Sequence, residues 1–267
     1  MNSLVAAANF AHPYTRDFIE TLRSNGITLF SYEVSAINEL VKGLTAFNLW
    51  DKFISLYPYV GRNSVSHSFN LIDPRKWRLT FSRTITHNAN GITSNGSDGY
   101  GNTGIQINNL SQFNFSMGSY RRTIGTNGAS LYPDIGSSYT PTGNTDRFFI
   151  GSNSTDTTNQ NGVAGFGGQG AGSTTQGSLT GTGMKCFTCT DNGGSGFRSI
   201  NNGAVTFTGS GNQTWQANGH IWICRCSTFF GTQNISLSYT SVGLTNTESL
   251  LLSNIVQNYQ SLLNRAV

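Results

Sequence analysis

Paired carboxylates are the first chemistry to look for in this chain of 267 residues. Enzymes that hydrolyse glycosidic bonds use two of them, about 5 to 9 Å apart, commonly with a glutamate in the pair. Between Leu40 and Thr247 there is no glutamate. From residue 61 to residue 243 the aspartates stand singly in turn-like segments, at Asp73, Asp98, Asp134, Asp146, Asp156 and Asp191. No two are separated by two residues, the spacing that would place both on one face of a strand. We therefore expect no catalytic residues and no enzyme.

Serine–histidine chemistry is the second possibility. The central region holds His67, His87 and His220. A serine nucleophile would lie on a Gly-x-Ser-x-Gly turn that leads into a helix. No such turn is present, and Gly194-Ser195-Gly196 lies within a cluster of turn-forming residues. Structural, hydrogen-bonding histidines are the simpler interpretation.

The four cysteines form two close pairs, Cys186 with Cys189 and Cys224 with Cys226, which superficially resemble two halves of a zinc site. Zinc-binding thiolates lie on tight turns, whereas both pairs lie in runs typical of strands. Alternation along a strand places Cys186 and Cys189 on opposite faces and Cys224 and Cys226 on one face. We expect buried thiols rather than zinc, and no cofactor. Four cysteines are also too few for a disulfide scaffold.

Aromatic and amide side chains give the chain a possible carbohydrate-binding chemistry, because aromatic rings stack on sugars and amides bind their hydroxyl groups. The candidate glycan contacts are Tyr100, Asn102, Tyr120 and Trp215. Tyr132 and Trp222 are further aromatic candidates, although Trp222 lies in an apolar strand and is most simply a core residue. Asp98 and Asn102 could bind calcium. A single loop carboxylate is more simply part of a turn, so no metal site is expected.

The elements that position these side chains are predicted to be strands. The centre of the sequence is rich in Gly, Ser, Thr and Asn, and turn dipeptides such as Asn90-Gly91 and Asn202-Gly203 separate short alternating runs. Nine or ten such runs are recognisable, from Val65–Leu71 and Trp77–Thr86 to His220–Thr228 and Gln233–Tyr239. This pattern predicts an antiparallel two-sheet sandwich of jelly-roll type. The long segment from Gly151 to Gly183 is either a flexible excursion or a hairpin laid across a partner.

Composition excludes several other classes of protein. Seventeen Phe, ten Tyr and four Trp are too many for a disordered chain. Only 10% of residues are charged, and the net charge of +4 is spread thinly, so nucleic-acid binding is not expected. No segment approaches the roughly 18 apolar residues of a membrane span. The first residues lack the features of a signal peptide, so no targeting segment is expected.

Helical patterns lie at both ends of the chain. A helix is predicted from Pro13 to Asn25, a second from Ser31, and a third over Asn48–Leu56. Near the C-terminus, Thr245 and Glu248 fit a capping box that begins a last helix. The candidate assembly residues on these elements are Leu49, Trp50, Phe53, Leu251, Ile255 and Tyr259. They either cover the β-body of their own chain or dock onto a neighbouring subunit.

Several short strings resemble a recurrent pattern in structural proteins of tailed bacteriophages. They are Ala36–Val41, Leu56–Gly61, His67–Pro74, Leu79–Phe81, Thr86–Ile92, Asn95–Thr103 and Gly243–Glu248. The resemblance spans most of the chain and is weakest between Gly125 and Gly183. Proteins of this kind are fibres, appendages or surface proteins with a concanavalin A-like (laminin-G-like) sandwich. The shared strings mark fold and lineage rather than a catalytic site.

Pattern and resemblance together imply a mainly β, concanavalin A-like jelly-roll sandwich with N-terminal helices and one C-terminal helix. Residues 1–60 are expected to form the helical segment, 61–243 the sandwich and 244–267 the last helix. The expected role is a non-enzymatic structural subunit of a bacteriophage virion, assembled in the host cytoplasm. Its expected partners are other virion proteins and further copies of itself, a trimer by analogy. The alternative is an adhesin that binds a glycan on the host surface.

Overall fold

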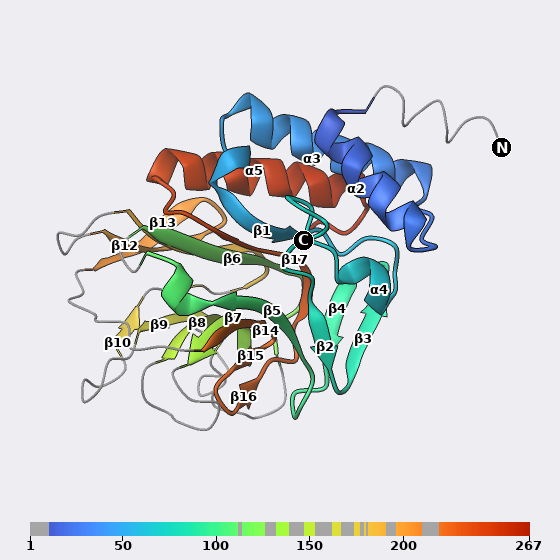
Figure 1. The fold of residues 1–267 in the computed structure, drawn as a ribbon. Helices are drawn as coiled ribbons and strands as arrows, with labels where there is room; N and C mark the ends of the chain where they lie inside the picture. The colour runs from blue at the N-terminus through green and yellow to red at the C-terminus, as the bar shows by residue number, and fades with distance from the viewer. Residues whose placement is uncertain are drawn as a thin grey trace.

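The computed structural model of the chain describes residues 11–111, 114–125, 132–138, 147–152, 162–166, 174–176, 179, 181–190, 196–209 and 219–267. Two antiparallel sheets are stacked on each other, and helices cover the outer face of one of them (Figure 1). The expected fold class, a mainly β sandwich of concanavalin A-like jelly-roll type with helices at both ends, is confirmed.

The first sheet has the strand order β13-β12-β11-β6-β17-β4-β3, and β1 also pairs with β17. Its strands are β1 (Phe53–Tyr57), β3 (Ile85–Asn88), β4 (Gly91–Ser94), β6 (Phe115–Arg121), β11 (Gly183–Cys189), β12 (Phe197–Asn201), β13 (Ala204–Gly209) and β17 (Asn234–Ser241). Strands distant in sequence lie side by side here: β17 lies between β6 and β4 and places Tyr239 opposite Gly118.

The second sheet has the order β10-β9-β8-β7-β14-β5-β2. Its strands are β2 (Thr80–Ser82), β5 (Tyr100–Gln106), β7 (Tyr132–Ser138), β8 (Arg147–Ser152), β9 (Gly162–Phe166), β10 (Thr174–Gln176) and β14 (His220–Ile223). A short ribbon of β15 (Arg225–Cys226) and β16 (Phe229–Phe230) follows β14. It lies on the side of the second sheet that faces away from the helices (Figure 1).

The helical layer consists of α2 (Pro13–Ser24), α3 (Ser31–Ala46) and α5 (Asn246–Leu262), with the short turns α4 (Ser64–His67), η1 (Trp50–Lys52) and η2 (Ile107–Asn109) elsewhere. Pro13 begins α2 as predicted. The capping box at the start of α5 is also confirmed, since Thr245 N donates to Glu248 Oε2 at 2.9 Å and Glu248 N donates to Thr245 Oγ1 at 3.2 Å. Glu33 on α3 is buried and accepts hydrogen bonds from Phe30 N and Gly61 N.

The candidate assembly residues face the interior of their own chain. All six belong to, or pack against, the apolar cluster between the helical layer and the first sheet. Leu49 and Tyr259 have no exposed surface, and Trp50 and Phe53 have little. Leu251 and Ile255 are partly buried at the margin of the cluster. Tyr259 Oη also donates to Pro58 O at 2.8 Å. These side chains therefore cover the β-body of their own chain, which is the first of the two alternatives that the sequence left open.

Three predicted elements are wrong. Asn48–Leu56 is a turn of 3₁₀ helix followed by β1, because the backbone of this segment pairs with β17 far along the chain. The expected strand over Val65–Leu71 begins with the helical turn α4, capped by Asn63. Trp77–Thr86 is divided between β2 and β3, since Arg83 has a φ of 59°. The boundary expected at residue 60 consequently leaves one strand of the first sheet in the helical segment.

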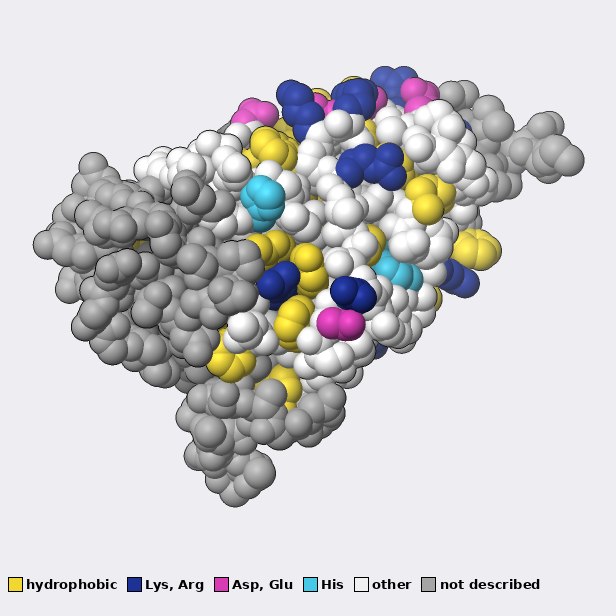
Figure 2. Space-filling model, turned by 60° about the horizontal axis from the view of Figure 1, so that its bottom comes forward, with side chains coloured by type: hydrophobic (Ala, Val, Ile, Leu, Met, Phe, Trp, Pro, Cys, Tyr) yellow, Lys and Arg dark blue, Asp and Glu magenta, His cyan; other side chains and the backbone are white. Residues whose placement is uncertain are grey.

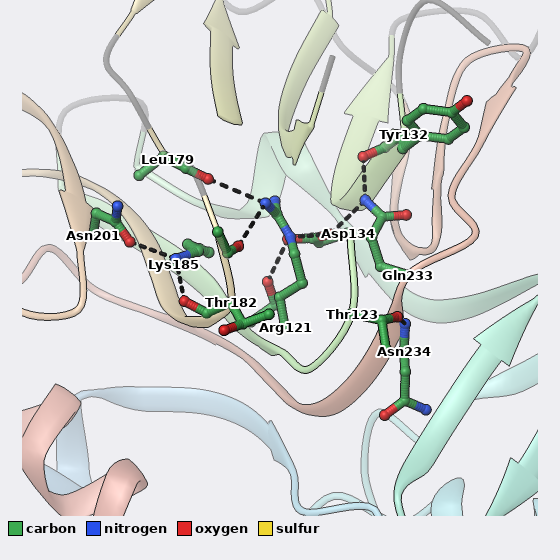
Figure 3. Close-up of polar contacts among 12 residues, drawn as sticks. Arg121, Thr123, Tyr132, Asp134, Leu179, Thr182, Lys185, Asn201, Gln233 and Asn234 are labelled. Carbon is green, nitrogen blue, oxygen red and sulfur yellow. Dashed lines mark hydrogen bonds and ion pairs between the residues drawn. The ribbon is translucent and has the colours of Figure 1, made fainter. Parts of the chain in front are cut away.

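A buried polar network joins the two sheets (Figure 3). Arg121 on β6 and Asp134 on β7 form an ion pair, and Ser119 Oγ and Gln233 Nε2 donate to the same carboxylate at 2.9 and 2.8 Å. Arg121 Nη1 also donates to Leu179 O at 3.1 Å. Both carboxylate oxygens of Asp134 accept hydrogen bonds from side chains on β6 of the first sheet. This network therefore fixes the position of the second sheet relative to the first.

Candidate functional site

The outer face of the second sheet carries the candidate site. Along β5 the side of each residue alternates: Thr103 and Ile105 are buried, Tyr100 and Asn102 are partly exposed, and Gly104 is exposed. On the neighbouring strand β14, Ile221 and Ile223 belong to the core between the sheets, whereas Trp222 does not. Trp222 is opposite Asn102 in the register of the two strands. Both side chains therefore lie on the face that points away from the helices.

Three aromatic rings and one arginine gather at one end of this face. The guanidinium of Arg225 lies 4.5 Å from the ring centroid of Tyr100, 4.7 Å from Trp222 and 5.3 Å from Phe230. Tyr100 also meets Trp222 edge to face, with 6.5 Å between the ring centroids. We call these four residues the aromatic–arginine cluster. Figure 2 shows hydrophobic, basic and histidine side chains close together on this side of the molecule.

The backbone at Cys224 places Arg225 over the rings. Cys224 has a φ of 61°, the left-handed region, so the chain turns between β14 and β15 instead of continuing as one strand. Cys224 N donates to Asp134 O and Gly231 N donates to Cys224 O, which hold the turn against β7. Arg225 Nε donates to Ser227 O at 2.9 Å. The hydrogen bond at Nε consequently holds the guanidinium group of Arg225 near the three aromatic rings of the cluster.

An amide and an imidazole lie beside the cluster. Asn102 Oδ1 accepts from Gly104 N at 2.9 Å, which fixes the orientation of the amide. Asn102 Nδ2 is then the donor in its 3.1 Å contact with His220 Nδ1. His220 is therefore the tautomer that carries its proton on Nε2, and both side chains are partly exposed. The pair presents a fixed N–H donor next to an aromatic surface.

Trp77 extends the surface along β5. Its side chain is 38% exposed, and a Cβ placed on Gly104 would lie 3.9 Å from Trp77 Cε3. Gly104 is four residues from Tyr100, about 13 Å at the usual rise of a strand. Trp77, Asn102, His220 and the aromatic–arginine cluster together form what we call the outer strip. It has aromatic rings at both ends and hydrogen-bonding groups between them, over the length of a short oligosaccharide.

The acids found in the described part of the chain lie apart from the strip or in turns. Asp134 is enclosed by its network, Asp73 binds Arg75 and Lys76, and Asp98 accepts from Asn95 Nδ2 at 2.8 Å. Asp146, Asp156 and Asp191 lie outside the described residues. Among the residues that the structure describes, no three His, Cys, Asp or Glu side chains could hold one metal ion. Asp98 and Asn102, the candidate calcium ligands, bind separate partners.

The histidine and cysteine predictions have mixed outcomes. His67 Nδ1 and His87 Nδ1 lie 3.1 Å apart, so these two histidines bind each other. Cys186 belongs to the cluster under the helices and Cys189 to the core between the sheets, which confirms that they lie on opposite faces of β11. Cys224 and Cys226 do not share a face, because the turn at Cys224 points it into the core while Cys226 packs on Phe149.

Two of the four candidate glycan contacts, Tyr100 and Asn102, lie together on the outer strip. Tyr120 is fully buried on the opposite side of the first sheet, where its hydroxyl donates to Gln257 Oε1 at 2.7 Å, so it is not a surface contact. Trp215 lies outside the described residues. Trp222 is buried, with 6% of its surface exposed, as expected of a core residue, although Arg225 rather than the facing sheet covers its ring.

Sequence reasoning did not single out Arg225, Phe230 or Trp77 as site residues. Alternation through His220–Ile223 carried a signal, since a strand with Ile221 and Ile223 inside must present Trp222 on the other face. Alternation along the strand does not predict the position of Arg225, because this position depends on the left-handed backbone at Cys224.

No protein-family model and no curated protein matches the sequence. Among solved structures, the chain is similar to the sialidase of Trypanosoma rangeli, with a TM-score of 0.55 and 11% identity over 84% of this chain and 39% of the sialidase. The complex of that sialidase with 2,3-difluoro-KDN gives a TM-score of 0.53 and 12% identity over 86% of this chain and 40% of the sialidase. At such identities the likeness shows the sandwich fold alone, and the chain spans about two fifths of the sialidase.

A third similar structure is domain 4 of AbnA, an extracellular GH43 arabinanase of Geobacillus stearothermophilus, in complex with arabinotriose. Its TM-score is 0.48 and its identity 14%, over 76% of this chain and 98% of that domain. In the part of the chain that the structure describes, no helix is long and apolar enough to cross a membrane.

Proposed function

We propose that this chain is a non-catalytic carbohydrate-binding β-sandwich that holds a glycan along the outer strip. The observation that carries the proposal is the arrangement of the partly exposed Tyr100 and Asn102 on one face of a rigid sheet, with Arg225 and His220 beside them. Aromatic rings supply apolar faces for sugar rings, and fixed amide and imidazole groups orient hydroxyls. The sialidase that shares the fold was solved with a sugar-acid ligand, which supports the proposal at the level of fold.

A glycan microarray followed by NMR titration tests the proposal. We expect the wild-type chain to bind a defined set of glycans. Tyr100→Ala should weaken this binding at least tenfold, about 1.4 kcal/mol, because it removes a central ring of the cluster. Tyr32→Ala is the matched control, since Tyr32 is a similarly exposed tyrosine in the helical layer. Equal binding by wild type and Tyr100→Ala would contradict the proposed site.

The proposal that the protein is not an enzyme rests on its carboxylates. Asp73 and Asp98 lie in separate exposed turns, and Asp134 is fully buried in an ion pair. Most glycoside hydrolases use two carboxyl groups that flank one bond. Incubation of the purified protein with a panel of polysaccharides should release no reducing sugar. Release that is lost on substitution of a single aspartate would overturn this part of the proposal.

A second proposal concerns the setting of the domain. The strings that resemble tailed-phage structural proteins, together with the low content of charged residues, favour a virion surface subunit that assembles with other virion proteins. A glycan-binding strip on such a subunit would act as a host-surface adhesin. Symmetric oligomers are usual for such subunits, and a trimer is the first arrangement to test. Light scattering gives the oligomeric state, and imaging of labelled protein on intact particles tests the location; a clean monomer would contradict the trimer.

A further inference from the structure

The backbone of β5 bulges at Gly104. Asn102 is opposite Trp222 and Gln106 is opposite His220, so β5 holds extra residues where β14 holds only one between its two paired positions. Gly104 lies in this irregular stretch and has a φ of 73°, a conformation that residues with a side chain seldom adopt. A β-bulge changes the direction of the side chains around it and is frequent beside binding sites.

Two side chains of β5 hold the bulge in place. Asn102 Oδ1 accepts from Gly104 N at 2.9 Å, and Thr103 Oγ1 accepts from Ile105 N at 3.0 Å. Thr103 Oγ1 also donates to Ile221 O at 2.8 Å. Side chains therefore satisfy two consecutive backbone amides that would otherwise need partners in the sheet. The conformation of the bulge is fixed before any ligand binds.

The bulge leaves an open position on the outer strip. Among the described residues, a Cβ on Gly104 would have only Trp77 Cε3 within 4 Å, apart from its chain neighbours. Trp77 precedes β2, which pairs with one side of β5, and His220 lies on β14, which pairs with the other side. Neighbouring strands lie about 4.8 Å apart, so about 10 Å separates these two flanks of Gly104. This is room for one sugar ring.

The two flanks differ in chemistry. Only one indole atom of Trp77 comes near Gly104, so the ring meets the strand by its edge, and the side chain is 38% exposed. On the other flank, Asn102 Nδ2 donates to His220 Nδ1, which leaves the proton of the neutral imidazole on Nε2. A ligand above Gly104 would meet an apolar surface on one side and an N–H donor on the other.

We propose that the surface above Gly104 selects a pyranose of galacto configuration, in which the 4-hydroxyl is axial. Such a ring has two unlike faces: one presents the hydrogens of C3, C4 and C5 together, and the other carries the axial oxygen. The apolar face would stack on Trp77, and the axial oxygen would accept from His220 Nε2. A gluco-configured ring has only equatorial hydroxyls and two similar faces. This inference rests on the proposed glycan-binding function and adds the configuration of the sugar.

The test uses two pairs of disaccharides, titrated by NMR against the full chain. Lactose and cellobiose differ only in the configuration of one C4 atom, and so do melibiose and isomaltose. The first pair carries a β linkage and the second an α linkage. We expect the galacto member of at least one pair to bind about tenfold more tightly than its gluco partner, because the gluco ring cannot place O4 against the donor.

Filling the open position should block the site. Gly104→Asn adds a side chain beside Trp77, and asparagine tolerates a left-handed backbone better than most residues. It should weaken binding of the preferred disaccharide about tenfold or more. Gly26→Asn is the matched control, because Gly26 has a φ of 76°, lies after α2 and has no described atom within 4 Å of its Cβ position. It should change binding by less than about twofold.

Further variants separate the two flanks. Trp77→Ala should weaken binding of both members of a pair, because the stacking surface is lost. Phe47→Ala is its control, since Phe47 is an exposed aromatic residue at the end of α3. His220→Phe should instead bring the two members to within about twofold of each other, because the donor that distinguishes O4 is lost. Circular dichroism and thermal unfolding establish that each variant is folded.

The outcomes separate this inference from the proposed function. Tyr100-dependent binding with equal affinities within both pairs overturns the galacto preference and leaves glycan binding standing. Binding of other glycans on the microarray but of none of the four disaccharides does the same. A preference that persists in both Gly104→Asn and His220→Phe also overturns the inference. Absence of binding to every glycan on the microarray overturns both.

Discussion

Arg121 and Asp134 form an ion pair in the interior of the sandwich, with 2.7 Å between Arg121 Nη2 and Asp134 Oδ2 and no exposed surface on either side chain. The pair connects β6 of the first sheet with β7 of the second. Arg121 Nε also donates to both carboxylate oxygens, at 3.2 and 3.0 Å. Two opposite charges buried together are stable only while both remain, since either one alone is an uncompensated buried charge.

Asp134→Ala should therefore destabilise the protein strongly. We expect the free energy of unfolding, measured by urea denaturation, to fall by about 3–5 kcal/mol, because Arg121 would be left buried without its partner. Arg75→Ala is the matched control, since its ion pair with Asp17 is exposed, and it should lower the free energy of unfolding far less than Asp134→Ala does. Equal losses in the two variants would contradict the structural role of the buried pair.

Acid should destabilise the chain through His67 and His87. Burial, then the neighbouring His87 and Arg265, lower the pKa of His67, and burial lowers the pKa of His87 to about 4, from the ordinary value of 6.5. The unfolded chain thus takes up protons at a higher pH than the folded chain. The stability contributed by the neutral pair is complete above about pH 6.5 and is lost as the pH falls toward 4.

Denaturation curves across this pH range check the effect. The wild-type protein should lose stability on acidification, and the double variant His67→Gln/His87→Gln should show a clearly shallower dependence. Tyr59 and Phe81, which pack edge-on against the pair, contribute no charge in this range, so the difference between the two slopes belongs to the histidines. An unchanged slope in the double variant would rule out the histidines as its source.

The thiols should be unreactive in the folded protein. All four cysteines are buried, and burial raises the pKa of Cys186 and Cys224, so little nucleophilic thiolate is present near neutral pH. Ellman's reagent should label them only after unfolding in denaturant. Metal analysis of the same sample tests the zinc hypothesis, and one equivalent of zinc per chain would revive it.

The C-terminal helix is expected to stabilise the chain without determining its oligomeric state. Leu252 on α5 is 1% exposed and belongs to the cluster over the first sheet, whereas Leu250 on the same helix is 47% exposed. Leu252→Ala should cost about 2–5 kcal/mol of unfolding free energy. Leu250→Ala should change stability by less than about 0.5 kcal/mol. Light scattering should give the same mass for both variants, and a change confined to Leu252→Ala would restore the docking role of this face.

Local signals in the sequence were sufficient for much of the fold. Pro13 begins α2, and Thr245 and Glu248 cap α5, because each depends on contacts within a few residues. The segment from Asn48 has apolar residues at helical spacing, but pairing with β17, almost two hundred residues away, makes it a strand. Such long-range pairing overrides local propensity.

The candidate site likewise combines features set by neighbouring residues with features set by residues distant in the sequence. Tyr100 and Asn102 share a face because they are two residues apart in β5. The contact of Arg225 with Trp222 required the left-handed conformation of Cys224, a residue type that rarely adopts it. Tyr120 has the same alternation and aromatic character as Tyr100, and only the position of α5 shows that it is buried.

Asn102→Asp provides a test of the hydrogen bonds at the centre of the strip. The carboxylate can still accept from Gly104 N, but it replaces the Nδ2 donor, so His220 must move its proton to Nδ1 to keep the contact. The ¹⁵N chemical shifts of the His220 ring distinguish the two tautomers. We expect Nε2–H in the wild type and Nδ1–H in the variant. Because the variant also adds a negative charge to the strip, it should weaken binding of an acidic glycan more than binding of its neutral partner. A wild-type ring with its proton on Nδ1 would contradict the arrangement of hydrogen bonds between Asn102 and His220.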